Sequence, residues 1–428
     1  MLHNVIESSY PIGFREAEAK ELGRQLRNRH SVVMVGMKRV GISSFLRFFL
    51  YHKSTLKTYV QDNKRHLLIA VDLHDLVERE LFPFWVLTFK RIVDAVEKLG
   101  DQSLQKKADT LFLSSIQANN LFLTIDNIRQ VLTALVEKNI MPSIFFIRFD
   151  RILEVANQDF FSNIMGLQES THQKLALVFT SYRSLHEISP QMFPRASLSV
   201  FAHELYIKPA KTADVLSVYE TFKHKYRLKT AKGLEKKLFA LCDGYIQYLQ
   251  LALIILHEQK RIIESEDELK ELLFRDERIT LQSEELWESL TDDEKKVLLF
   301  SISNKKLLDK DKRKAKYLFD TGILDEKGTV FSELFLEFLK VKEKETKESL
   351  GELSKKEHTL FTLLQKQGDG ICERELIVQE VWSEVEAFGV SDWAIDRLVA
   401  RLRSKLKLQK SEFEIQTIKT RGYKLVKV

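Results

Sequence analysis

Two glycines, Gly36 and Gly41, bracket the first segment of the chain whose residue types could do chemistry. A short apolar run rich in β-branched residues (31–35) precedes them, and Ser43 and Ser44 open an amphipathic segment. A glycine-bracketed loop between a strand and a helix can surround phosphate groups with backbone amides, and the helix dipole adds to the attraction. This spacing predicts a phosphate-binding loop.

One position departs from the pattern G-x-x-x-x-G-K-[ST], because Ile42 stands where the lysine belongs. The missing ammonium would bridge phosphate oxygens, which isoleucine cannot do. Lys38 and Arg39 offer cations from other loop positions, although a solvent-facing basic loop is the simpler interpretation. We expect no ATP hydrolysis, whereas binding of ATP or ADP and a purely structural loop both stay open. The candidate nucleotide-binding residues are Gly36, Lys38, Arg39, Gly41, Ser43 and Ser44.

A second group of cations lies near the end of the chain. Between residues 391 and 406, apolar residues recur at steps of three and four, which is the spacing of one buried helical face. Arg397, Arg401 and Lys405 are four apart on another face, and Ser391 can cap the helix. The apolar positions are Ile395, Leu398, Val399, Leu402 and Leu406.

A β-hairpin is predicted after this helix. Phe413 and Ile415 alternate with polar residues, the turn 419–422 follows, and residues 423–428 form the return strand. Residues 397–428 hold ten Lys or Arg and two Glu, a local charge of +8, so the remainder sums to −2 of the total +6. Because local cation density governs attraction to phosphates, this segregation predicts double-stranded DNA as a partner. A solvated basic tail is the alternative.

The motifs around the first loop resemble STAND-type members of the AAA+ ATPases. The resemblance rests on residues 14–18, the loop 36–46 and the segment 242–250. It implies a parallel α/β sheet followed by a helical lid, and the alternation of expected strands at 31–35, 67–73, 141–147 and 175–179 with helices agrees. Thr180 to Arg183 matches the sensor position.

In that family the third strand ends in Asp-Glu, which holds Mg²⁺. This chain has Arg148, Phe149 and Asp150 there, so Asp150 is the only, weak candidate for a metal contact. We expect no metal without nucleotide. Residues 286–339 resemble the winged helix that closes many of these ATPases, with Thr291 and Glu294 as a capping box.

Residues 353–428 resemble the OmpR/PhoB-type winged-helix effector domain from end to end. The resemblance implies that the helix enters the major groove and the hairpin turn reaches the minor groove. Thr420 and Arg421 depart from the small residue pair usual before Gly-Tyr. The loop Ser383 to Gly389 corresponds to one that touches RNA polymerase in the family, with a solvated loop as the alternative. The implied DNA-binding residues are Arg397, Arg401, Arg403, Lys405, Thr417, Lys419 and Arg421.

Length and composition bound the rest of the prediction. A chain of 428 residues is too long for one core, and 44% hydrophobic with 30% charged residues is typical of a globular protein. Cys242 and Cys372 lack metal-ligand spacing, and no apolar run is long enough for a membrane span, so we expect a cytoplasmic protein. The expected fold is multidomain: a P-loop α/β domain (1–205), a helical lid (206–280), a middle winged helix (281–340), a linker (341–352) and a DNA-binding winged helix (353–428).

These features together predict a sequence-specific DNA-binding transcriptional regulator. Its degenerate nucleotide-binding module would act as a sensor or assembly domain, with homo-oligomers possible. We expect no control by phosphorylation of a receiver domain. The alternatives are an NTP-dependent switch ATPase that remodels a protein complex, and a winged-helix assembly scaffold. The salt dependence of binding affinity distinguishes these alternatives, since DNA binding weakens steeply as salt is added.

Overall fold

The computed structural model describes residues 5–191, 193, 202–228, 231, 233–259, 261–303, 307–348, 353–368, 370–382, 390, 392–409, 411–418 and 421–427. Its contacts divide the chain into two compact units, Met1–Glu337 and Phe338–Val428. Each unit is described by itself. No helix among these residues is both long and apolar enough to cross a membrane.

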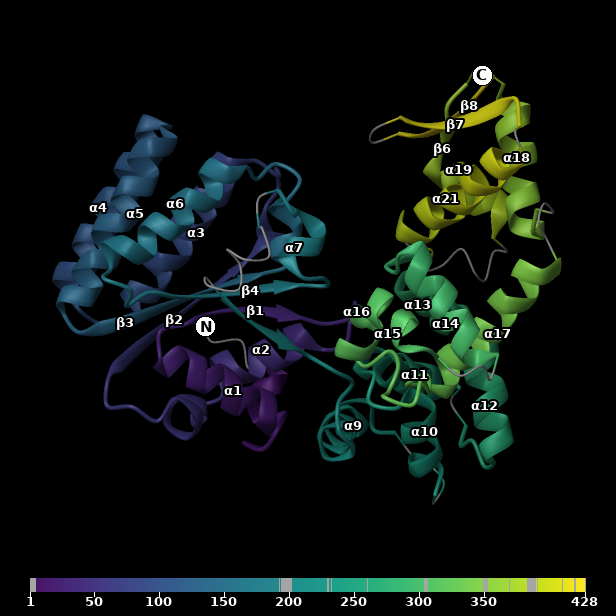
Figure 1. Ribbon diagram of the computed structural model, residues 1–428, viewed down its shortest axis with the longest axis horizontal. Helices are drawn as coiled ribbons and strands as arrows, with labels where there is room; N and C mark the ends of the chain where they lie inside the picture. Colours follow the sequence, from purple (N-terminus) through teal and green to yellow (C-terminus); the bar gives the residue numbers. More distant parts are fainter. Residues whose placement is uncertain are drawn as a thin grey trace. The chain divides into compact units, whose positions relative to one another are not determined.

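The first unit is built on a parallel five-stranded sheet in the order β2-β3-β4-β1-β5 (Figure 1). Strand β1 pairs with β4 on one side and with the edge strand β5 on the other, so that Val35 lies between Ser181 and Tyr206. All five residues of β1 are buried, as a strand covered on both faces requires. The strands are β1 (Ser31–Val35), β2 (Arg65–Asp72), β3 (Ile140–Ile147), β4 (Ala176–Ser181) and β5 (Ala202–Tyr206).

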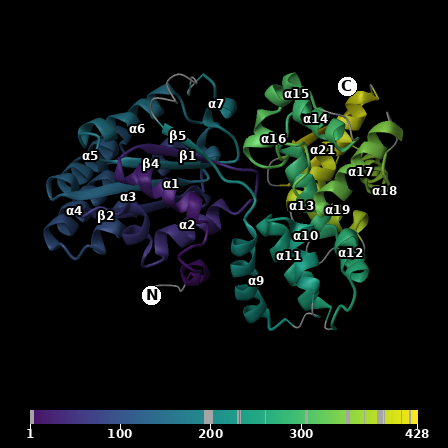
Figure 2. The same cartoon turned by 60° about the horizontal axis from the view of Figure 1, so that its bottom comes forward.

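Helices cover both faces of this sheet. Helices α3 to α6 lie on one face and α1 and α2 on the other, which Figure 2 brings forward. Rings pack between the layers, with Phe146 of β3 stacked on both Phe84 and Phe179. These helices are α1 (Glu16–Arg27), α2 (Ile42–Tyr51), α3 (Leu81–Glu97), α4 (Gln102–Ala118), α5 (Leu121–Glu137), α6 (Gln158–Ser170) and α7 (Leu185–Ile188), with short turns η1 (Ile6–Ser9), η2 (Leu56–Val60), η3 (Leu73–Asp75) and η4 (Phe149–Ile152).

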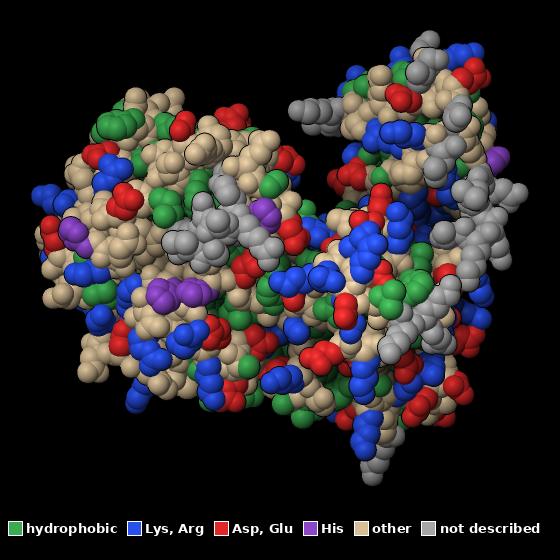
Figure 3. Space-filling view, in the orientation of Figure 1, with side chains coloured by type: hydrophobic (Ala, Val, Ile, Leu, Met, Phe, Trp, Pro, Cys, Tyr) green, Lys and Arg blue, Asp and Glu red, His purple; other side chains and the backbone are tan. Residues whose placement is uncertain are grey.

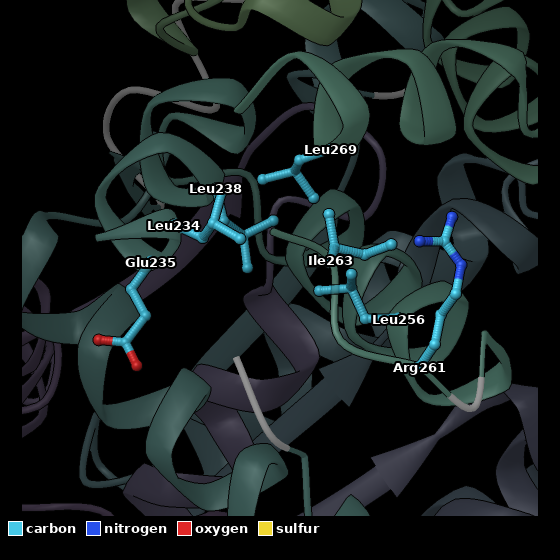
Figure 4. A pocket seen from close by; sticks show the side chains of 7 residues that line it. All are labelled: Leu234, Glu235, Leu238, Leu256, Arg261, Ile263 and Leu269. Atoms are coloured by element: carbon cyan, nitrogen blue, oxygen red, sulfur yellow. The ribbon is translucent and has the colours of Figure 1, made fainter. Parts of the chain in front are cut away.

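A helical lid follows β5. It consists of α9 (Thr212–Tyr226), α10 (Leu234–Cys242), α11 (Ile246–Glu258), α12 (Glu266–Arg275) and α13 (Glu277–Glu288). A pocket of about 20 Å³ in the lid is lined mainly by leucine and isoleucine, with the charged ends of Glu235 and Arg261 directed away from each other (Figure 4). This volume holds about one water molecule, so the pocket is a packing gap and not a ligand site.

The middle winged helix completes the first unit. It comprises α14 (Asp292–Ile302), α15 (Asp309–Lys314), α16 (Lys316–Asp320), the bridge between Leu324 and Val330, and the start of α17 (Glu333–Glu348). The predicted capping box is confirmed, because Thr291 and Glu294 each accept from the other's backbone amide. Helix α17 continues through residues 341–348 of the predicted linker.

The second unit is a small winged helix. Its elements are α18 (Lys355–Gln367), β6 (Cys372–Glu373), α19 (Arg374–Val381), α21 (Asp392–Leu408), β7 (Phe413–Ile418) and β8 (Gly422–Lys427), with the antiparallel sheet order β6-β8-β7. The apolar stripe predicted for α21 is confirmed, since Ile395, Leu398, Val399, Leu402 and Leu406 are all buried. The predicted cap, Ser391, lies outside the described residues.

Candidate nucleotide edge and nucleic-acid interface

The loop between β1 and α2 has the backbone of a phosphate loop but is packed with apolar side chains. Gly41 precedes α2 with a φ of 109°, a conformation that glycine adopts without strain. A methyl group added to Gly36 would come within 2.9 Å of Val40 Cγ1 and 3.3 Å of Ile42 Cδ1. The side chain at the lysine position therefore lies against the first glycine of the loop.

Donors from elsewhere in the first unit bind the carbonyl groups of this loop. The Tyr245 hydroxyl at the start of α11 donates to the Lys38 carbonyl (2.6 Å), and Arg15 Nη2 donates to the Val40 carbonyl (3.1 Å). Burial raises the pKa of Tyr245 well above its usual value, so this hydroxyl keeps its proton. The protein's own side chains thus hold the loop in place.

The two cations of the loop also contact other side chains. Arg39 Nε lies 2.5 Å from a carboxylate oxygen of Glu285 on α13, and the Lys38 ammonium stands 5.1 Å from the centre of the Tyr182 ring. Glu285 in turn accepts from Gln282, which donates to Tyr245. Loop and lid are therefore joined through a continuous set of polar contacts.

At the ends of β2 and β3, a cation lies where a magnesium site would need a carboxylate. Arg148, directly after β3, forms an ion pair with Asp72 at the end of β2. Asp150 lies in the turn η4, and burial raises its pKa while the charge of Lys38 opposes that shift. Among the described residues, no three His, Cys, Asp or Glu gather as metal ligands. With Ile42 in the loop, these residues do not fit a magnesium–nucleotide complex.

A polar cavity of about 370 Å³ adjoins Ser43, the residue that follows Ile42. Its lining includes Asp72, Asp75 and Asp94 as well as arginines. Arg91 binds both Asp75 and Asp94, so this cation is already neutralised by carboxylates within the cavity wall. Arg47 and Lys98 also line the cavity, so that three cations face three carboxylates there.

Arg183, at the predicted sensor position after β4, binds residues at the start of the middle winged helix. Its guanidinium makes a two-point contact with the Glu294 carboxylate, at 3.0 Å to Oε1 and 2.5 Å to Oε2, and it donates to the Ser289 carbonyl at 2.8 Å. The same guanidinium stacks 4.2 Å from the ring centre of Tyr317, whose hydroxyl donates to the Tyr182 carbonyl. Although burial lowers the pKa of Arg183, the Glu294 contact raises it above its ordinary value.

In the second unit, a single buried carboxylate binds two of the predicted DNA-contacting cations. Lys405 Nζ lies 2.7 Å and Arg401 Nε 3.6 Å from the oxygens of Glu357 on α18. The Glu357 side chain is only 3% exposed, whereas the side chains of Lys405 and Arg401 are 28% and 29% exposed. Burial would raise the pKa of Glu357, but the Lys405 hydrogen bond and its charge lower it below the usual value. Arg401 and Lys405 therefore share the single negative charge of Glu357.

The other predicted DNA-binding residues are distributed over the helix and the hairpin. Arg403 donates to the Ile415 carbonyl (2.8 Å) and to the Thr417 hydroxyl (2.7 Å), so it joins α21 to the hairpin. Arg397 stacks 5.4 Å from the Trp393 ring centre. Arg421 is 62% exposed and lies 3.9 Å from Glu373. Lys419 and the loop Ser383 to Gly389 lie outside the described residues.

Three glutamates were not singled out as partners of these cations. Glu285 is separated from Arg39 by 246 residues and Glu294 from Arg183 by 111, so no local spacing pointed to either pair. Glu357 precedes Lys405 by 48 residues on a different helix. The available signals were the capping-box positions of Glu294 and Glu357, which also bury both side chains.

Comparisons with known proteins match a family model to the second unit. Residues 347–425 match the family model described as transcriptional regulatory protein, C terminal. No curated protein sequence matches the chain. Among solved structures, the Walker-type ATPase PABY2304 of Pyrococcus abyssi has 15% identity and a TM-score of 0.48, covering 76% of this chain and 95% of that one.

Two further structures are the ORC2 and ORC1 proteins of Aeropyrum pernix. The ORC2 protein, in ADPNP–ADP complexes, has 12% identity and a TM-score of 0.43 over 78% of this chain and 95% of its own. The ORC1 protein, in complex with DNA, has 14% identity and a TM-score of 0.42 over 100% of this chain and 91% of its own.

The sheet order and the family match together describe the two units. The first unit has a parallel α/β sheet with strand order β2-β3-β4-β1-β5 and a loop at the phosphate-binding position, and it resembles a P-loop ATPase. The second unit, matched over residues 347–425, is a winged helix of the OmpR/PhoB-type transcriptional regulators.

Proposed function

We propose that the protein is a transcriptional regulator that binds specific sequences of double-stranded DNA through α21 and the β7–β8 hairpin. The observation that carries this proposal is the surplus of cations on a domain of the regulator family. Residues 397–428 hold ten Lys or Arg against two Glu, and the buried Glu357 neutralises only part of that charge. Such a surface attracts the phosphates of a duplex.

Within this interface, the residues have different roles. Arg397, Arg401 and Lys405 lie along α21, where they contact bases and phosphates of the major groove. Arg403 is a positioning residue, since its guanidinium fixes the hairpin strand at Ile415 and Thr417. Arg421, directly before β8, contacts the neighbouring minor groove, and Lys419, which lies outside the described residues, contacts it as well. The loop Ser383 to Gly389 contacts RNA polymerase in this proposal.

The first unit acts as an assembly domain and not as an ATPase. This part of the proposal is supported by Ile42 at the lysine position, by the ion pair of Arg148 with Asp72, and by the donors from Arg15 and Tyr245 on the loop carbonyls. In a working phosphate loop, a lysine and a metal-bound carboxylate stabilise the transferred charge. Here neither group is present at its position, so the fold persists without that chemistry.

The DNA-binding proposal is tested by selection from random duplexes. The full chain, equilibrated with a pool of random double-stranded fragments at physiological salt, is expected to enrich one sequence motif. The double variant Arg397→Ala, Arg401→Ala should lose that enrichment. The matched double variant Lys53→Ala, Lys57→Ala removes two exposed cations from the first unit and should retain it. Enrichment that is absent, or equal in both variants, would contradict the proposal.

The nucleotide proposal is tested by calorimetry and phosphate release. The wild-type chain should show no ATP turnover above background, and Ile42→Lys should bind ATP more tightly because it restores a cation at the loop. Ser43→Ala in the same background reports whether the loop itself holds the nucleotide. Turnover by the wild type that is abolished by Asp150→Ala would replace the assembly role with the switch-ATPase alternative.

A further inference from the structure

The end of the α4–α5 hairpin is an uncharged, apolar surface in an otherwise charged chain. From Thr110 to Ile125, between Asp109 and Asp126, no residue is Asp, Glu, Lys or Arg, although 30% of the chain is charged. This segment includes the last turns of α4, the connection at Asn119 and Asn120, and the first turn of α5. A surface without charge over both helices is not explained by packing alone, because its outer side chains face solvent.

Large hydrophobic side chains gather at this end. Phe122 is 78% exposed, Leu113 57% and Ile116 43%. Half-buried apolar residues surround them, namely Leu111, Phe112, Leu121 and Leu123. Figure 3 shows hydrophobic side chains together at this end of the hairpin, at the upper left of the first unit. Single exposed apolar residues are common on monomers, whereas a contiguous group marks an interaction surface.

The hairpin is well fixed beneath this surface. Asn127 of α5 donates to the Ser115 hydroxyl (2.9 Å) and to the Leu111 carbonyl (3.1 Å) of α4, and both polar side chains are buried. Asn120 caps α5 by accepting from the Leu123 amide. The apolar side chains are therefore presented by a rigid pair of helices, and a partner that covers them need not first order the hairpin.

We propose that the apolar end of the α4–α5 hairpin binds the same surface of a second copy of this chain. A two-fold interface places each surface against itself, so any charge at its centre meets its own like charge. The segment from Thr110 to Ile125 satisfies this condition because it has none. The absence of cations there argues against nucleic acid and anionic lipid surfaces, which both require positive charge. Two antiparallel helices from each copy form a compact four-helix contact.

The proposed dimer rests on the assembly role of the first unit, for which it names the contact surface. It does not depend on DNA binding. Sedimentation equilibrium of the full chain without DNA separates the two claims. The wild type is expected to show a concentration-dependent dimer below about 100 µM, and Phe122→Asp to weaken dimerisation at least ten-fold. Phe122→Ser, a milder change, should weaken it less.

The matched control is Val77→Asp, which places the same charge on a residue that is 98% exposed outside the hairpin. This variant should dimerise like the wild type. Circular dichroism and thermal unfolding show that each variant is folded. A wild type that stays monomeric over the whole concentration range would overturn the proposal, as would equal dimerisation by Phe122→Asp and Val77→Asp. Loss of DNA enrichment with intact dimers would contradict only the DNA-binding proposal.

Discussion

Two helices in the molecule begin with the same capping box, and their glutamates are used differently. In α14, Glu294 accepts from the Thr291 amide at 2.8 Å, and in α18, Glu357 accepts from the Ser354 amide at the same distance. Each carboxylate is also buried and binds cations. The Glu294 carboxylate binds Arg183, which follows strand β4, whereas Glu357 binds Arg401 and Lys405 of its own winged helix.

The difference shows how one motif serves two purposes. At Glu294, one carboxylate meets one guanidinium at two points, and the pair fixes the middle winged helix to the sheet. At Glu357, one carboxylate meets two cations that are still partly exposed. The first contact is internal and joins parts of the first unit, and the second leaves positive charge on a surface that an anion can reach.

The largest effect is expected from Glu294→Ala. Removing Glu294 leaves the buried Arg183 guanidinium with Glu187 as its remaining carboxylate partner (3.1 Å), which should cost about 3 kcal/mol in the free energy of unfolding, the low end for a broken buried pair. Glu294→Gln retains the shape of the side chain and should cost less. Denaturant unfolding of the full chain, followed by hydrogen exchange of amides in α14 and β4, measures both variants. A loss below ~1 kcal/mol would show that the pair does not join these elements.

The second effect concerns sequence discrimination by Arg401. Arg401→Ala should reduce the difference in binding free energy between selected and random duplexes by ~1–3 kcal/mol, the scale of a base contact. Fluorescence anisotropy with the two duplexes measures it. Equal weakening on both duplexes would assign Arg401 to phosphate, and unchanged binding to both would leave it as a structural partner of Glu357.

A smaller effect on stability is expected from Glu357→Gln. The loss of a charge-assisted hydrogen bond to Lys405 should destabilise the second unit by ~1–2 kcal/mol at neutral pH, measured by hydrogen exchange of α18 and α21. The folded pKa of Glu357 lies below its unfolded value of about 4.3, so its contribution is complete above that pH and is lost as the pH falls through the folded pKa. The wild type and the variant should therefore converge in acid, and a constant difference would contradict this assignment.

The smallest effect on stability is expected from Arg421→Ala. Its ion pair with Glu373 is exposed on both sides, so the free energy of unfolding should change by less than ~0.5 kcal/mol. Binding to all duplexes should nevertheless weaken, and the slope of log affinity against log salt should fall by about one. A change in discrimination without a change in slope would place Arg421 on a base.

The sequence predicts the elements better than the contacts between them. The predicted strand 31–35 has the same bounds as β1, because five consecutive buried positions require five apolar or small residues. Strand β5 was not expected, since Ala202 to Tyr206 includes His203 and Glu204 and lies at the sheet edge, where one neighbour suffices. Binary patterns record burial, and in β5 only Ala202 is buried, so no alternating pattern marks this strand.

The candidate sites show the same limit. Ile42 could be recognised as a departure from the loop pattern by its position alone. That Arg148 pairs with Asp72 and that Glu357 binds the α21 cations depends on long-range packing. Spacing within one helix gives the face of a residue, but it does not give the partner that another helix brings to that face.

Salt dependence of duplex binding by the full chain tests the central claim most directly. If cations of α21 and the hairpin bind phosphates, log affinity should fall linearly with log salt concentration, with a slope of about −4 or steeper for five or more contacts. Arg397→Ala and Arg421→Ala should each make that slope shallower, whereas Lys53→Ala should not. Absence of binding in dilute buffer, or a flat dependence on salt, would contradict the assignment of the second unit as a DNA-binding domain.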